Sequence, residues 1–401
     1  MSQLKYWVWL STLGGVGAVT AAALLRHFGT PENVYLAKAE DYMGIEGIKK
    51  ADISRLLGKS LETANKTLQS CSQIGCRVIT LQDADYPERL KNIYDPPITL
   101  YVKGNLPVID DEPVVSIVGT RSCTPYGLKA TENISYQLAL HGLIVTTGLA
   151  RGIDSAAARG AMRGGGRVIG VIGSGLDIVY PPENKELFED VVNMGVIISE
   201  YPPGSMPLPA HFPARNRILS GISLGVTVIE APKKSGALIT ASRALEQGRD
   251  VFALPGNVDA RNCEGSNLLL REGAIPILSY EDIISEYAEL FPDKILPSDS
   301  QNDTLDRRSS AQRKTEEYKT KVKKEIDNES MVEYIDLGEI LNLLVGDEKL
   351  VAETIGNTAM LTDDIIIGSG LSAPQVLTAL TMLEIKGFAK RENAEFKLIK
   401  G

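Results

Sequence analysis

The chain has 401 residues, of which 43% are hydrophobic and 23% are charged, and this composition excludes a wholly disordered, collagen-like or polytopic membrane protein. Its 42 basic and 51 acidic residues give a net charge of −9, so any phosphate-binding role must rest on a local cluster of cations. The four cysteines include no Cys-x-x-Cys pair, which argues against a disulfide framework and a zinc knuckle and favours a reducing, cytoplasmic compartment.

Residues 1–80 are expected to form an N-terminal helical domain of the helix-hairpin-helix or SAM-like type. The segment Tyr6–Leu25 carries no charge and is long enough to span a membrane, but three glycines interrupt it. We predict two short helices joined by this glycine turn, the second over Ala18–Phe28, and no membrane segment. A further helix is predicted over Lys49–Leu57. The glycine turns before these helices could expose N–H groups to a phosphate, or the domain could serve packing alone.

Residues 81–290 alternate short apolar runs with helical patterns. Continuous apolar runs separated by helices are typical of parallel strands that are buried on both faces. We therefore predict an α/β fold with a Rossmann-like, doubly wound and mostly parallel sheet. Its strands are expected at Val114–Val118, Leu143–Thr147, Arg167–Ile172, Val196–Ser199, Val226–Glu230, Val251–Leu254 and Ile275–Leu278.

Residues 291–330 are rich in charge and contain few large apolar side chains, so they are predicted to form a flexible linker. Residues 331–401 have the outline of a winged helix. Its segments are expected at Glu339–Val345, Thr362–Ile367 and Ala373–Lys386, followed by a strand pair at Phe388–Arg391 and Glu395–Ile399. This module has 6 basic and 11 acidic residues, which favours contact with a protein over contact with DNA.

The loops after the first five predicted core strands combine glycine or other small residues with hydroxyl groups or cations. Ligands of parallel sheets bind at the carboxyl ends of strands. Glycine allows a close approach of the backbone to an anion, and arginine binds phosphate oxygens in pairs. We therefore predict a phosphate-rich ligand at these loops, which cover residues 119–122, 148–154, 173–177, 201–217 and 233–236.

Common cofactor and catalytic motifs do not account for these loops. The loop after the first core strand lacks Gly-x-Gly-x-x-Gly, and Gly58-Lys59-Ser60 lacks the first glycine of a P-loop. The three histidines form no metal-binding pattern, so we expect neither a cofactor nor a metal. For single residues a structural role is the simpler interpretation. Arg215 and Arg217 could pair with carboxylates such as Glu200 and Glu230, and His211 could be packed.

Read together, the loops resemble the DNA-processing protein A family (DprA, also called Smf). The resemblance covers residues 80–285. The matching strings include Val118-Gly119-Thr120-Arg121, Gly148-Leu149-Ala150-Arg151-Gly152-Ile153-Asp154, Gly173-Ser174-Gly175-Leu176-Asp177, Ser199-Glu200-Tyr201-Pro202-Pro203-Gly204, Phe212-Pro213-Ala214-Arg215-Asn216-Arg217-Ile218 and Ser235-Gly236-Ala237-Leu238-Ile239-Thr240-Ala241. One departure is Ala157-Ala158, where the family usually has a histidine.

The resemblance implies a cytoplasmic single-stranded DNA-binding protein without catalytic turnover. Such a protein forms a homodimer and helps to load a RecA-type recombinase during natural transformation. Carried onto this chain, the family's DNA pocket falls at Gly119, Thr120, Arg121, Gly148, Arg151, Gly152, Gly173, Ser174, Gly175, Arg215, Asn216, Arg217, Lys234, Ser235 and Gly236. Exposed aromatic residues such as Tyr201 or Phe212 would stack on bases.

Two other hypotheses remain. A nucleotide-processing enzyme of the Rossmann-like phosphoribohydrolase type would have a glutamate three residues after Thr240, where this chain has Arg243. Alternatively, the site at the sheet is vestigial, and the acidic winged helix recruits a partner protein.

Overall fold

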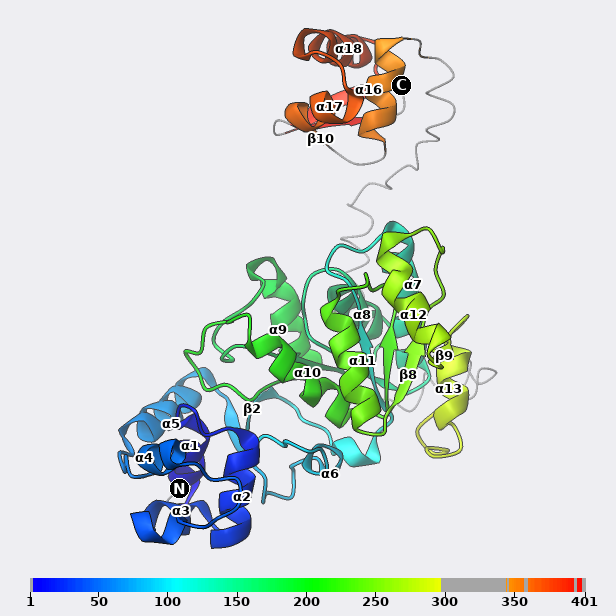
Figure 1. Ribbon diagram of the computed structural model, residues 1–401. Coiled ribbons are helices and arrows are strands. Elements are labelled where there is room, and N and C mark those ends of the chain that lie inside the picture. Colours follow the sequence, from blue (N-terminus) through cyan, green and yellow to red (C-terminus); the bar gives the residue numbers. More distant parts are fainter. Residues whose placement is uncertain (1–2, 297–343, 345, 357–359, 393–394, 399–401) are drawn as a thin grey trace. The chain divides into compact units, whose positions relative to one another are not determined.

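The computed structural model of the chain describes residues 3–296, 344, 346–356, 360–392 and 395–398 (Figure 1). Internal contacts divide the chain into two compact units, residues 1–322 and 323–401. The first unit contains an N-terminal group of helices and a large sheet, and the second is a small α/β module.

Residues 4–74 form a helical group around Trp7, Leu10, Leu24 and Tyr42. Two short helices joined by the glycine turn confirm the prediction for this segment. No helix within the described residues is long and apolar enough to cross a membrane. The helices are α1 (Leu4–Thr12), α2 (Ala18–Phe28), α3 (Pro31–Leu36), η1 (Ala39–Tyr42), α4 (Lys50–Leu56) and α5 (Glu62–Ile74).

Within the described residues, nine strands of the first unit form one sheet in the order β1-β2-β6-β5-β4-β3-β7-β8-β9. Strands β3 to β9 run parallel, which confirms the doubly wound, mostly parallel sheet, and β2 pairs antiparallel with β1 and β6. The strands are β1 (Arg77–Thr80), β2 (Thr99–Gly104), β3 (Val114–Val118), β4 (Ile144–Thr147), β5 (Val168–Ile172), β6 (Val196–Ser199), β7 (Gly225–Val228), β8 (Asp250–Ala253) and β9 (Ile275–Pro276).

Helices cover both faces of this sheet (Figure 1). Alternate residues of each strand point to opposite faces, so two apolar cores form, one on each side. One face packs against α7 (Pro125–Leu140), α8 (Ile153–Arg163), α9 (Lys185–Met194) and α13 (Glu281–Tyr287). The other packs against α6 (Glu88–Lys91), α10 (His211–Ile222), α11 (Gly236–Glu246) and α12 (Glu264–Arg271).

Strands β1 and β2 were not predicted from the apolar runs of the core. Strand β1 follows α5 and lies within residues 1–80, yet it pairs with β2 as part of the main sheet. At the other end of the unit, Phe291 packs against the core and Ile295 is buried in it, although both lie in the predicted linker. The backbone N–H of Leu296 donates to the carbonyl of His141 at 3.0 Å. Residues 297–330 of the predicted linker lie outside the described residues.

The second unit contains α16 (Asp347–Ile355), α17 (Thr362–Ser369) and α18 (Ala373–Ile385). Strands β10 (Met360–Leu361), β11 (Ala389–Glu392) and β12 (Glu395–Leu398) form a small antiparallel sheet. The last helix and the strand pair confirm the winged-helix outline. The predicted helix Glu339–Val345 lies almost wholly outside the described residues, and α16 was not predicted.

The order of the main sheet has a switch point between β3 and β7. The chain runs outward from β3 through β4 and β5 to β6, and then returns to place β7 on the other side of β3. The loops that leave β3 and β7 therefore diverge to opposite faces of the sheet. Such a divergence opens a crevice at the carboxyl ends of the strands.

Candidate functional site

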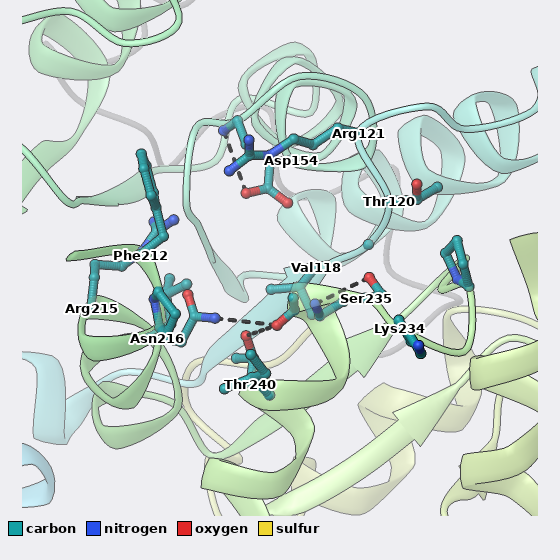
Figure 2. A pocket seen from close by; sticks show the side chains of 18 residues that line it. Val118, Thr120, Arg121, Asp154, Phe212, Arg215, Asn216, Lys234, Ser235 and Thr240 are labelled. Atoms are coloured by element: carbon teal, nitrogen blue, oxygen red, sulfur yellow. Dashed lines mark hydrogen bonds between the residues drawn. The ribbon is translucent and has the colours of Figure 1, made fainter. Parts of the chain in front are cut away.

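A hollow of about 310 Å³ lies at this switch point (Figure 2). Its walls come from the loops after β3, β4 and β7, and from the first turns of α10 and α11. Three cations and one carboxylate line it: Arg121, Arg215, Lys234 and Asp154. In Figure 2, Arg121 and Asp154 lie on one side of the hollow, Arg215 and Asn216 on a second, and Lys234 and Ser235 on a third.

The loop after β3 is tied to the loop after β7. The backbone N–H of Thr120 donates to the carbonyl of Glu230 at 2.7 Å. The buried carboxylate of Glu230 accepts from the backbone N–H of Thr124 at 2.9 Å and from the Thr124 hydroxyl, and thereby fixes the start of α7. A Cβ at Gly127 would lie 2.5 Å from Cδ of Glu230, so glycine is required there. Glu230 thus shapes the loops and pairs with neither Arg215 nor Arg217.

Arg215 lies beneath the loop after β4. Its side chain is 4% exposed, and its Nη1 donates to the carbonyl of Val171 at the end of β5. A Cβ at Gly148 would overlap the guanidinium, so this glycine makes room for the arginine. Burial lowers the pKa of Arg215 to about 10, against the opposing effect of Asp154, which leaves the side chain charged at neutral pH. Its Nε has no hydrogen-bond partner within the described part of the chain.

Asp154, in the first turn of α8, is the carboxylate of the hollow. Burial raises its pKa, whereas the charges of Arg215 and Arg121 favour the ionised form. Its Oδ2 accepts from the backbone N–H of Ala150 at 3.4 Å, drawn as a dashed line in Figure 2. Asp154 therefore braces the loop after β4 and partly balances the arginines.

The start of α11 forms the wall opposite this loop. The Ser235 hydroxyl caps the helix by accepting from the backbone N–H of Ala237 at 3.3 Å. Asn216 Nδ2 donates to the carbonyl of Gly236 at 3.2 Å and so ties α10 to α11. Lys234 is exposed just before the cap. A helix N-terminus with a neighbouring cation favours an anion.

Arg121 and Phe212 meet at the mouth of the hollow. The Arg121 guanidinium lies 5.3 Å from the centre of the Phe212 ring, within the range of a cation–π contact. Arg121 is exposed and Phe212 is half-buried, so both are accessible to a ligand.

Two other candidate arginines have carboxylate partners. Arg217 is 6% exposed, with Nη2 2.7 Å from Glu200 and Nε 3.1 Å from Asp95. Burial lowers its pKa, but these two ion pairs outweigh burial and hold the pKa above its ordinary value. Arg151 is exposed and pairs with Glu183.

The loop after β5 is occupied by contacts within the chain. The carbonyl of Gly173 contacts Nδ1 of His211 at 3.0 Å, and the Ser174 carbonyl accepts from the Ser199 hydroxyl at 2.7 Å. The His211 ring stacks on Tyr201 with centroids 3.9 Å apart. His211 is therefore packed, and Tyr201 already has one ring partner.

The structure brings about half of the sequence-predicted residues together. Those that line the hollow are Gly119, Thr120, Arg121, Arg215, Asn216, Lys234, Ser235 and Gly236. Those that do not line it are Gly148, Arg151, Gly152, Gly173, Ser174, Gly175 and Arg217. Sequence reasoning did not select Ile239 and Thr240, although a helix that starts at Gly236 places them one turn inside the site.

A doubly wound sheet with a cationic hollow at its switch point defines a Rossmann-like protein whose loops can hold an anionic ligand. Comparison with known families specifies this class further. Residues 77–288 match the family model described as DNA recombination-mediator protein A, and residues 343–394 match the DprA winged helix domain. The chain belongs to the DNA recombination-mediator protein A family.

Individual relatives agree with this assignment. The chain is 40% identical to Protein Smf of Synechocystis sp. over 315 residues, which cover 76% of this chain and 79% of that protein. It is 45% identical to DNA processing protein DprA of Streptococcus pneumoniae over 208 residues, which cover 52% of this chain and 73% of that protein. The X-ray structure of DNA processing protein A from Streptococcus pneumoniae superposes with a TM-score of 0.63 at 37% identity, covering 70% of this chain and 97% of that chain.

Proposed function

We propose that the chain binds single-stranded DNA at the hollow, with phosphate groups against Arg121, Arg215, Lys234 and the start of α11. The observation that carries this proposal is the convergence of Arg121, Arg215 and Lys234 and the start of α11 on one hollow, which they line together with the carboxylate of Asp154. Cations in excess over carboxylates favour an anionic ligand, and phosphate oxygens bind both guanidinium groups and the N–H groups of a helix N-terminus.

Size and charge support a single strand as the ligand. A hollow of about 310 Å³ is at the lower end of the range for small-ligand sites and admits one nucleotide-sized group. Three cations against one carboxylate make the hollow locally positive in a chain whose net charge is −9. Of the candidate site, we assign the eight lining residues to DNA contact inside the hollow, Arg151 to a phosphate contact outside it, and Gly148 and Gly152 to shaping the loops.

Beyond DNA binding, we propose that the protein acts as a recombination mediator that loads a RecA-type recombinase during DNA uptake. In this role it works in the cytoplasm as a homodimer, without a cofactor and without catalytic turnover. Family membership supports this proposal. Loading can be measured as ATP hydrolysis by the recombinase on single strands that are covered by a single-strand-binding protein. We expect the full chain to stimulate this hydrolysis.

Fluorescence anisotropy of labelled single-stranded and duplex oligonucleotides, across a salt series, tests the DNA site. We expect a preference for the single strand and a log–log salt slope of about −0.7 per phosphate neutralised. Arg121→Ala and Lys234→Ala should each weaken binding about tenfold and flatten the slope by about 0.7.

Arg271→Ala is the matched control, because Arg271 is an exposed cation that does not line the hollow. It ends α12 shortly before β9 begins, and so lies toward the amino ends of the parallel strands, whereas the hollow lies at their carboxyl ends. A flat salt response, or equal losses in the site and control variants, would refute the site. Release of free base from nucleoside monophosphates would instead support the nucleotide-processing enzyme.

A further inference from the structure

Tyr180 lies outside the hollow, yet its ring is placed beside the residues at the mouth. It follows β5, and its side chain is 41% exposed. Its ring centre is 5.6 Å from that of Phe212, at an interplanar angle of 42°. Phe212 also contacts the Arg121 guanidinium, so Arg121, Phe212 and Tyr180 form a row of planar groups that starts at the hollow and leads out of it. We call these three residues the stacking row.

The loop that carries Tyr180 is anchored on both sides. Before it, the Asp177 carboxylate accepts from the backbone N–H of Gly204 at 2.9 Å. After it, Nδ2 of the buried Asn184 donates to the Leu149 carbonyl and to the Ser155 hydroxyl, both at 2.9 Å. These bonds hold an exposed aromatic ring on a fixed backbone. A ligand that contacts the ring therefore has little loop entropy to overcome.

We infer that Tyr180 is a base-stacking residue, which receives the base of a nucleotide adjacent to the one whose phosphate occupies the hollow. This inference rests on the proposed function. Every base has an aromatic face, so stacking tolerates any sequence, and a chain of planar groups beside cations is a common device for single strands. Bases in a duplex already stack on both faces, so the stacking row favours single strands over duplex.

The test compares Tyr180→Ala and Tyr180→Phe with the wild-type full chain. The probes are a labelled oligothymidylate and an abasic strand of equal length, which has the same phosphates and no bases. We expect Tyr180→Ala to weaken binding of oligothymidylate by roughly 5- to 100-fold and binding of the abasic strand less than twofold. Tyr180→Phe keeps the ring and should bind as the wild type does.

Tyr136→Ala is the matched control. Tyr136 is a partly exposed tyrosine in the last turns of α7. This helix ends shortly before β4 begins, so Tyr136 lies toward the amino ends of the parallel strands, whereas the hollow lies at their carboxyl ends. Circular dichroism melting establishes that each variant is folded.

The outcomes separate this inference from the proposed function. If Arg121→Ala and Lys234→Ala weaken binding but Tyr180→Ala does not, the stacking role is wrong and the phosphate site stands. Equal losses of Tyr180→Ala on both probes, or a loss in Tyr180→Phe as large as in Tyr180→Ala, would also overturn it. If the wild type binds no single strand, both proposals fail.

Discussion

At the residue scale, the partners of Arg151 determine whether this arginine can contact DNA. Its ion pair with Glu183 is exposed on both sides, and the pair raises the pKa of Arg151 and lowers that of Glu183. Exposed ion pairs contribute little to stability and are readily exchanged. We therefore predict that a DNA phosphate replaces Glu183 as the partner of Arg151.

Glu183→Gln should consequently increase affinity for single-stranded DNA by about two- to fivefold, because Arg151 no longer has a competing carboxylate. Anisotropy at low salt measures this change. Glu246→Gln is the control, since Glu246 also pairs with an exposed arginine, Arg243, that does not line the hollow. Unchanged affinity in Glu183→Gln would show that Arg151 takes no part in binding.

Lys59 lies within an aromatic cage in the N-terminal helical group. Its Nζ is 5.2–5.4 Å from the ring centres of Trp9, Tyr35 and Tyr42, and it donates to the Tyr42 hydroxyl at 2.6 Å. Burial lowers the pKa of Lys59 to about 8. The tripeptide that resembles part of a P-loop thus supplies a structural lysine.

This pKa predicts how stability changes with pH. Between pH 8 and about 10 the unfolded chain holds the Lys59 proton more often than the folded chain does, so the free energy of unfolding should rise with pH. Denaturant unfolding at pH 8.0 and 9.5 measures the slope. Lys59→Met should remove the contribution of Lys59 to this slope. An identical slope in both proteins would contradict the lowered pKa of Lys59. The upper limit of pH 9.5 lies below the ordinary pKa of tyrosine, about 10, so that most tyrosines stay protonated in the unfolded chain as well.

At the scale of elements, the loop after β4 depends on a glycine that leaves room for an arginine. Gly148 leaves the space that the Arg215 guanidinium fills. Gly148→Ala should destabilise the protein by about 1–3 kcal/mol, because the arginine must leave its place, and it should weaken DNA binding as well. Thermal melting and anisotropy measure the two effects. Gly14→Ala is the control, because a Cβ at Gly14 would meet nothing within 4 Å.

The parallel strands could be predicted from the sequence because each is a continuous apolar run that is buried on both faces. Strands β3 and β6 have the predicted bounds, and the other five differ by one or two residues at their ends. Strand β2 meets this criterion over its first four residues but was missed, and β1 does not meet it. They lie before the βα alternation begins, and β1 has a half-exposed pattern at the sheet edge.

The candidate site was predictable to the extent that it follows topology. Glycine-rich loops indicated the carboxyl ends of five strands, but not that the hollow lies between the loops after β3 and β7. The partners of each arginine depend on residues far apart in the chain. The expected pairing with Glu200 is confirmed for Arg217 and not for Arg215. The second partner of Arg217, Asp95, comes from a distant segment and was not predicted.

At the scale of the whole molecule, the end of the first unit can be tested by truncation. A chain that ends at residue 296 keeps Phe291 and Ile295 in the core, whereas one that ends at residue 290 loses both. The shorter chain should be less stable by about 2–4 kcal/mol, since burial of one large apolar side chain contributes about 1.5–3 kcal/mol. Denaturant unfolding of the two chains measures the difference.

The same truncations address the second unit. If the hollow carries DNA binding, the chain that ends at residue 296 should bind single-stranded DNA within about twofold of the full chain. A large loss of affinity in that chain would assign the DNA contact to residues 297–401 instead.

The edge of the main sheet at β9 limits the pairing of this sheet with a strand from another molecule. Strand β9 has two residues, and the second is Pro276, which has no N–H to donate. Short edge strands with proline resist pairing with a strand from another molecule. Fibril growth by extension of this sheet is therefore blocked at β9, and two chains that met at this edge would be joined by side chains rather than by a shared ladder of backbone hydrogen bonds.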